Sequence, residues 1–159
     1  MKKAILIAVF ALLCTGAFAQ SAKAIYGKYS GQEGVEGIYI SESMFKMIGG
    51  IPDLPLGDMP MDISPYLKSM KGMYLLNTSN DSQLYDDVQK LVSAGKYELM
   101  MEVNDGSDKV NIYTEKSGNM ITSFVLLVRD SSECVFICLD GQISEEDFQK
   151  LISEAMKNA

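Results

Sequence analysis

Residues 97–140 of this chain decide its fold, and they read YELMMEVNDGSDKVNIYTEKSGNMITSFVLLVRDSSECVFICLD. Four stretches of this segment are rich in the β-branched, aromatic and other apolar residues that strands favour: Tyr97–Val103, Lys109–Glu115, Met120–Arg129 and Cys134–Asp140. Short connections rich in Asn, Asp, Gly and Ser separate them, and these residue types form hairpin turns. The segment therefore predicts a four-stranded antiparallel meander at the C-terminal end of the sheet.

The last two of these strands are apolar at every position of residues 124–128 and 135–139. The strand before them alternates apolar and polar residues instead, which is typical of a sheet with one solvent-exposed face. Strands that are apolar on both faces are usually covered on both faces. We therefore expect the last two strands to lie centrally, with a covering layer on each side.

Flanking residues predict helices and two further strands, at Val35–Ile40 and Gly72–Thr78. A short helix is expected over residues 21–30, and another after Ser41 with the apolar face Met44, Phe45, Met47 and Ile48. The clearest internal helix, after residue 81, repeats the apolar residues Leu84, Val88, Leu91 and Val92 at helical spacing. A last helix is expected after the cap Ser144, with the apolar stripe Phe148, Leu151, Ile152 and Ala155. Residues 20–159 thus form a single α+β domain, a mostly antiparallel sheet with helices packed against it.

Residues 1–19 have the pattern of a secretory signal peptide. Lys2 and Lys3 precede the apolar run Ala4–Leu13, which is shorter than the roughly 20 residues that span a bilayer. Ala17 and Ala19 are small residues at the two positions that signal peptidase reads. We expect cleavage before Gln20 and export to the periplasm or cell envelope, with no transmembrane anchor after processing.

Two alternatives to this processing are an uncleaved anchor and a lipoprotein. Lipid attachment at Cys14 is less favoured than cleavage before Gln20, because a lipoprotein signal has a small residue directly before its cysteine. Here the bulky Leu13 occupies that position.

The composition excludes several classes of function. The formal net charge is −7, and loss of Lys2 and Lys3 makes it −9, so the chain lacks the basic footprint of a nucleic-acid binder. It contains no histidine, which removes Ser-His-Asp and Cys-His nucleophile arrangements and His-ligated zinc. Since no other catalytic or cofactor-binding motif is present, we expect a protein that is not an enzyme and that carries no cofactor.

Cys134 and Cys138 lie four residues apart on one predicted strand. Their Cα atoms would be about 13 Å apart at about 3.3 Å per residue, and a disulfide spans at most about 7 Å. We expect two buried thiols that behave as small apolar residues.

Residues 51–65 form an apolar segment that four prolines interrupt. Prolines at this density exclude a regular helix or an interior strand, and long loops are often functional. We expect this loop to form a binding surface with Leu54, Leu56, Met59 and Met61, which contacts a small hydrophobic ligand or a protein of the envelope.

Clustered methionines suggest an alternative function, the handling of a soft metal such as copper. The thioethers of Met44, Met47, Met59, Met61, Met70 and Met73 fall within one short part of the chain. Thioethers are soft ligands that favour Cu(I). Methionine also fills irregular gaps in a core and suits an adaptable apolar surface, and either use would account for the same residues without a metal.

Carboxylates suggest two weaker alternatives. Glu98 and Glu102 share one face of a predicted strand, as the two acids of a carboxylate-based hydrolase would. Asp53, Asp58 and Asp62 in the proline-rich loop offer oxygen ligands for calcium. Solvated surface acids account for both sets without any function.

Several segments resemble a family of small exported proteins of Bacteroidetes, classed as a domain of unknown function of the DUF-4252-like type. They are residues 35–41 (VEGIYIS) with Met44 and Phe45, residues 72–76 (GMYLL), residues 97–103 (YELMMEV) with 110–113 (VNIY), and residues 140–143 (DGQI). The resemblance covers nearly all of residues 20–159 and implies one exported domain. It brings no catalytic residues. The sequence thus predicts an exported, non-enzymatic binding or interaction domain, with a role in envelope maintenance or stress response.

Overall fold

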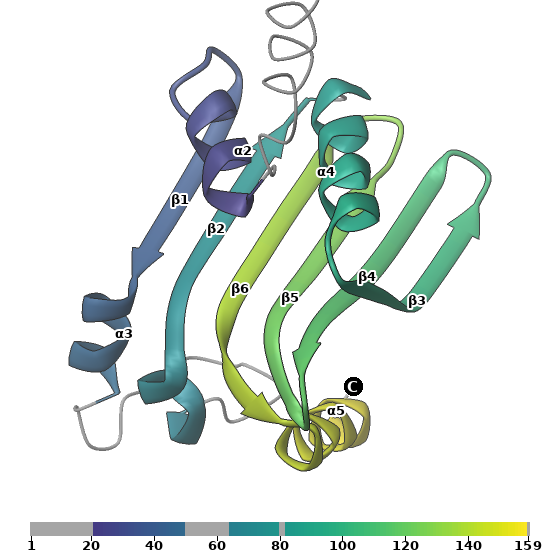
Figure 1. Ribbon diagram of the computed structural model, residues 1–159. Coiled ribbons are helices and arrows are strands. Elements are labelled where there is room, and N and C mark those ends of the chain that lie inside the picture. Colours follow the sequence, from purple (N-terminus) through teal and green to yellow (C-terminus); the bar gives the residue numbers. More distant parts are fainter. Residues whose placement is uncertain (1–20, 50–63, 80–81, 159) are drawn as a thin grey trace, which may run out of the picture.

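A six-stranded antiparallel sheet forms the centre of the molecule (Figure 1). The computed structural model describes residues 21–49, 64–79 and 82–158. Its strands are β1 (Val35–Ser41), β2 (Met70–Thr78), β3 (Tyr97–Asp105), β4 (Asp108–Ser117), β5 (Met120–Arg129) and β6 (Cys134–Ser144). They lie in the order β1-β2-β6-β5-β4-β3, so the last strand of the chain is in the middle of the sheet.

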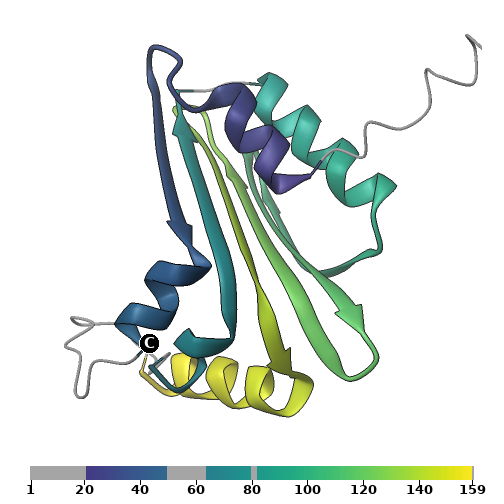
Figure 2. The same ribbon diagram turned by 60° about the vertical axis from the view of Figure 1, so that its left-hand side comes forward.

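The helices lie on the two faces of this sheet in different ways. Helices α2 (Ala22–Tyr29) and α4 (Ser82–Ala94) cover one face, which we call the helix face (Figures 1 and 2). Helix α5 (Glu145–Asn158) crosses one end of the sheet, and helix α3 (Glu42–Ile48) and the 3-10 turn η1 (Ser64–Ser69) lie at the same end. These three contact the opposite face, which we call the open face.

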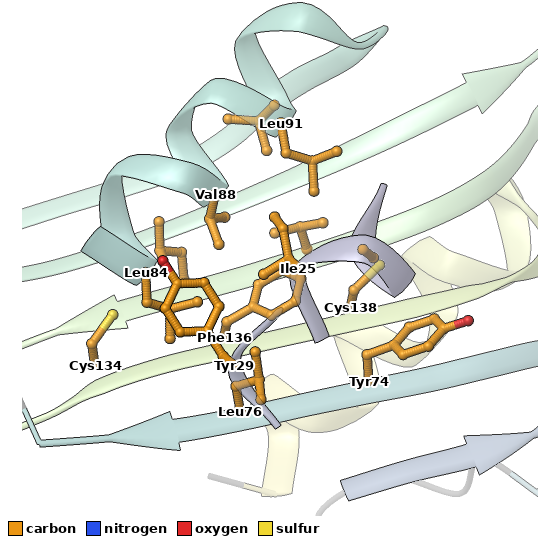
Figure 3. Close-up of a cluster of buried hydrophobic side chains, with 14 of the residues drawn as sticks. Ile25, Tyr29, Tyr74, Leu76, Leu84, Val88, Leu91, Cys134, Phe136 and Cys138 are labelled. Atoms are coloured by element: carbon orange, nitrogen blue, oxygen red, sulfur yellow. The ribbon is translucent and has the colours of Figure 1, made fainter. Parts of the chain in front are cut away.

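The main core lies between the helix face and the two helices on it (Figure 3). Helix α4 has helical-period apolar residues, and it buries Leu84 and Val88 fully against the sheet. Helix α2 adds Ile25 and Tyr29, which are 2% and 1% exposed. From the sheet, Leu76, Phe136 and Leu127 are adjacent in the strand register, and all three have no exposed surface.

Asp87 joins the two helices of this layer. Its carboxylate accepts a hydrogen bond from the Tyr29 hydroxyl at 2.9 Å and forms ion pairs with Lys28 and Lys90. The Asp87 side chain is 9% exposed. An acid on α4 is therefore compensated by partners from α2 as well as from its own helix.

The predicted α+β class is confirmed, but the sheet is larger than the four-stranded C-terminal meander that the sequence predicts. Strands β3 to β6 do pair in sequence order. However, β2 pairs with the outer side of β6 and β1 follows it, so the sheet has six strands. The two early strands found in the sequence therefore belong to the same sheet as the later four.

Two predictions about burial are wrong. Strands β5 and β6 are central, but a layer covers them along their length on the helix face only, and their other side chains are half-buried. Helix α3 begins after its expected cap, with the Ser41 hydroxyl accepting from the Met44 amide. Of its predicted apolar face only Phe45 is buried; Ile48 is half-buried and packs against the cluster of Phe45, Leu67 and Met70, and Met44 and Met47 are exposed.

Cys134 and Cys138 are both buried thiols, as predicted. They lie on β6 among the apolar side chains of the helix face (Figure 3). The C-terminal helix also begins where expected, because Ser144 accepts a hydrogen bond from the Asp147 amide at 3.1 Å.

Candidate functional site

The open face of the sheet is built from apolar cross-strand rows. In its middle row each residue is the register partner of the next across all six strands: Ile38, Leu75, Ile137, Leu126, Ile112 and Met101. Alternation along the strands accounts for this row, because every second residue of a strand points to the same face. A continuous apolar band therefore crosses the whole sheet on the side that α2 and α4 leave uncovered.

Two further rows lie on either side of this band. Nearer the free end of the sheet are Glu36, Asn77, Val135, Val128, Val110 and Val103. Nearer α5 are Ile40, Met73, Leu139, Phe124, Thr114 and Glu98. The charged members of the three rows, Glu36 and Glu98, are both on edge strands.

Exposure along the middle row and the row nearer the free end rises from the centre of the sheet toward its edges, whereas Thr114 in the row nearer α5 is fully buried. Leu126 and Ile137 are half-buried, whereas Ile38, Met101 and Val103 are 41%, 44% and 46% exposed. Half-burial of central residues comes from their neighbours within the sheet. Single exposed apolar residues are common on proteins, but a contiguous apolar face marks a site of interaction.

An apolar pocket lies at the α5 end of this face. Its volume is about 270 Å³, and apart from Thr122, Ser123 and Gly141 it is lined by apolar side chains: Phe45, Tyr66, Leu67, Met70, Met73, Ile121, Phe124, Leu139, Ile143 and Phe148. They come from α3, η1, α5 and three neighbouring strands of the sheet. Such a pocket accepts an apolar group and offers little that would orient a polar one.

Helix α5 forms one wall of the pocket through Phe148. The rings of Phe148 and Phe124 are 6.2 Å apart between centroids and tilted by 52°, which is a favourable arrangement of aromatic rings. At the start of α5, Lys116 of β4 forms ion pairs with Glu145 at 2.8 Å and Glu98 at 3.4 Å. The hydrogen bond to Glu145 raises the pKa of Lys116. These contacts fix the position of the helix over the end of the sheet.

The binding residues predicted from the sequence, Leu54, Leu56, Met59 and Met61, lie outside the described residues. The aspartates considered for calcium, Asp53, Asp58 and Asp62, lie outside them as well. The neighbouring residues that the structure does describe, Phe45 before this segment and Tyr66 and Leu67 after it, line the apolar pocket.

Four of the six methionines considered for copper are described. Met70 and Met73 both line the apolar pocket, Met70 at 5% exposure. Met44 and Met47 lie on α3 at 42% and 61% exposure, outside the lining of that pocket. The structure therefore brings Met70 and Met73 to one pocket and leaves Met44 and Met47 at the surface.

The prediction that Glu98 and Glu102 share one face of a strand is wrong. A β-bulge between Leu99 and Met101 shifts the register, so Glu98 pairs with Thr114 and Glu102 pairs with Asn111. Thr114 and Asn111 point to opposite faces of β4, because they are three residues apart. The two carboxylates are consequently on opposite faces of the sheet.

A buried polar cluster beside the pocket was missed by the sequence analysis. Ser123 donates to Asp140 at 2.8 Å and shares a hydrogen bond of 3.0 Å with the Tyr97 hydroxyl, and the Cys138 thiol lies 3.5 Å from Asp140. Burial raises the pKa of Cys138, with Asp140 adding to the rise, and burial also raises the pKa of Tyr97. Both groups stay protonated, so neither is an activated nucleophile and the cluster ties β3, β5 and β6 together. The residues of this cluster come together only through the strand register, which cannot be read from the individual residues.

Within residues 21–49, 64–79 and 82–158, no three acidic or cysteine side chains converge as metal ligands would. The helices of these same ranges are also too short or too polar to cross a bilayer.

Fold and site together define a two-layer α+β domain with one helix-covered face, one apolar face and an apolar pocket at the end of the latter. The sequence profile of the family DUF4252, described as a domain of unknown function, matches residues 29–151. The chain therefore belongs to the DUF4252 family. No curated protein and no solved structure gave a match.

Proposed function

We propose that this protein is an exported, non-enzymatic binding domain that takes the apolar part of a ligand, such as a fatty acyl chain, into the pocket between α5, η1 and the sheet. The observation that carries the proposal is the lining of the pocket, which is apolar on nearly every side. Its volume of about 270 Å³ is close to the lower end, about 300 Å³, of small-molecule pockets. That size suits one chain or one branch of a larger lipid.

Export and an envelope role are part of the same proposal. The signal-peptide pattern of residues 1–19 supports export. An apolar ligand also suits the cell envelope, where lipids and lipid-modified proteins are abundant. Envelope maintenance is the process in which we expect such a binding domain to act.

Titration calorimetry with dodecanoate tests the pocket. The purified protein should bind this probe, and Met73→Glu should weaken binding at least about tenfold, because a carboxylate placed in an apolar pocket loses its hydration. Met47→Glu is the matched control, since it makes the same change on exposed α3 outside the pocket lining. Absence of binding by the unaltered protein, or equal loss in both variants, would contradict the proposal.

Handling of Cu(I) is the second candidate, because Met70 and Met73 both line the pocket. Replacing both with leucine keeps the apolar volume and removes both thioethers. If copper is the ligand, a Cu(I) titration should lose its signal in this double variant, whereas dodecanoate binding should persist. Unchanged Cu(I) uptake would exclude these two residues as ligands.

A further inference from the structure

We infer that Phe148 limits the length of the acyl chain that the apolar pocket accepts, because it separates this pocket from a second cavity along α5. The inference rests on the proposed function, since it names the residue that sets chain-length specificity at the same site. We call the second cavity the side cavity. Its volume is about 110 Å³, and its lining residues are Met100, Lys116, Ile121, Glu145, Phe148 and Gln149.

Two residues line both cavities, and they mark the boundary between them. Phe148 of α5 and Ile121 of β5 belong to the lining of the apolar pocket and to that of the side cavity. The strand residues of the apolar pocket come from β2, β6 and β5, whereas those of the side cavity come from β5, β4 and β3. Because the strand order is β2-β6-β5-β4-β3, the two cavities lie next to each other along α5 and meet over β5 (Figure 1).

Contacts with the sheet hold the Phe148 ring at this boundary. The ring packs on Phe124 of β5, with 6.2 Å between the centroids, and the Phe148 side chain is half-buried. Phe124 itself lines the apolar pocket. A chain that fills the pocket therefore meets the Phe148 ring before it reaches the side cavity.

The side cavity suits the end of an apolar chain, although two of its lining residues are charged. Lys116 and Glu145 form an ion pair with each other at 2.8 Å, so the cavity offers a compensated pair and not a lone charge. Met100, Ile121 and Phe148 supply apolar lining. Space for further methylene groups is thus present on the far side of Phe148.

The β-bulge in β3 contributes to the side cavity. Met100 lies between Leu99 and Met101, where the register shifts, and it has no register partner among the residues of β4. The extra residue of a bulge redirects a side chain at the edge of a sheet. Here that residue lines a cavity together with α5, so the bulge helps to build the space beyond Phe148.

Calorimetric titration with saturated fatty acids tests the inference. The series is octanoate, decanoate, dodecanoate, tetradecanoate and hexadecanoate, each kept below the concentration at which it forms micelles. In the unaltered protein the affinity should rise about fourfold for each methylene that enters the pocket, and it should level off once the chain reaches Phe148. In Phe148→Ala the affinity should level off only at a longer member of the series, because the chain then enters the side cavity.

Tyr66→Ala is the matched control for the loss of an aromatic ring. Tyr66 is half-buried like Phe148, and among the residues that the structure describes it lines the apolar pocket but not the side cavity. This variant enlarges the pocket by one ring without opening the side cavity. The chain length at which affinity levels off should therefore increase less than in Phe148→Ala.

Phe148→Leu covers the case in which Phe148→Ala fails to fold, as judged by circular dichroism. Leucine keeps an apolar contact with Phe124 and is smaller than the phenyl ring, so the limiting chain length should change in the same direction.

The outcomes distinguish this inference from the proposed function. If the unaltered protein binds none of the fatty acids, the proposed function fails and the inference fails with it. If the protein binds them, two results overturn the inference alone. One is a limiting chain length that increases no further in the folded Phe148 variant than in Tyr66→Ala, and the other is an affinity of the unaltered protein that keeps rising through hexadecanoate.

Discussion

Asp87 is the residue whose ionisation most directly links two elements of this fold. Burial alone would raise its pKa, but hydrogen bonds from Lys28, Tyr29 and Lys90 outweigh that effect, and the pKa is lowered. A lowered pKa in the folded state means that the carboxylate stabilises the fold above its unfolded pKa of about 3.9. This contribution is lost as the pH falls through the folded pKa.

Asp87→Asn should lower the free energy of unfolding at pH 7 by about 1.5–3 kcal/mol, the usual contribution of hydrogen bonds to a charged group. Urea denaturation at pH 7 measures this loss. Repeated at successively lower pH, the difference between the variant and the unaltered protein should shrink as the pH falls through the lowered folded pKa of Asp87, because the acid then becomes protonated in the folded state too. A loss that stays the same throughout this acid series would contradict this role.

The thiols of Cys134 and Cys138 should be inert in the folded protein. Both side chains have no exposed surface, and burial raises the pKa of Cys138. Only a thiolate reacts with iodoacetamide, so mass spectrometry of the peptide that contains both residues should show no alkylation until urea unfolds the protein. Rapid alkylation of the native protein would mean that β6 is accessible.

At the scale of single elements, α5 connects the fold to the proposed binding site. Its first turn contains Glu145, Glu146 and Asp147, whose charges suit the positive end of the helix dipole. The Ser144 side chain caps this turn, and Phe148 in the next turn lines the pocket. A change at the cap should therefore affect ligand binding without touching the ligand.

Ser144→Ala should destabilise the protein by about 1 kcal/mol, the usual cost of losing an N-cap side chain. Because the first turn of α5 becomes looser, dodecanoate affinity should fall as well. Ser153→Ala, on an exposed part of the same helix, is the control and should leave both quantities nearly unchanged. Thermal unfolding and calorimetry on the same samples check both expectations. If Ser144→Ala binds dodecanoate as tightly as the unaltered protein, the capped first turn of α5 does not contribute to binding.

Several elements were predictable because a local pattern determines them. Helix α4 has four apolar residues at helical spacing, and all four are buried in the main core. Helix α3 was found too, but its buried face was not, since the burial of Phe45 and the exposure of Met47 depend on where β1 and η1 bring the helix. The bulge that separates Glu98 from Glu102 is likewise set by pairing with β4 and leaves no local sequence signal.

At the scale of the whole molecule, the strand order determines which parts resist opening. Strands β2, β6 and β5 have a partner on each side, whereas β1 and β3 are edge strands. An edge strand opens at lower cost because fewer hydrogen bonds and fewer apolar contacts are lost.

Hydrogen exchange followed by mass spectrometry should therefore show the slowest amide exchange in peptides from β6, β2 and β5. Peptides from β1 and β3 should exchange faster, by a factor that depends on the global stability. If β1 were protected as strongly as β6, its outer edge would have to be paired with another strand in solution.

The order itself could not be read from the sequence. Neighbouring strands usually pair, which correctly gave β3 to β6 as a continuous set. The pairing of β2 with β6 joins segments more than fifty residues apart, so no hairpin turn in the sequence indicates that these two strands pair. The apolar pocket depends on this pairing, since Met73 of β2 and Leu139 of β6 reach it side by side.

The central position of β6 also determines when this chain can fold. Ribosomes deliver a chain from its N-terminus, so β1 and β2 emerge as one piece and β3 to β5 as another, with no strand to join them. The joining strand spans Cys134–Ser144. Until it emerges, Phe136 cannot take its place between Leu76 and Leu127, and the core on the helix face stays incomplete.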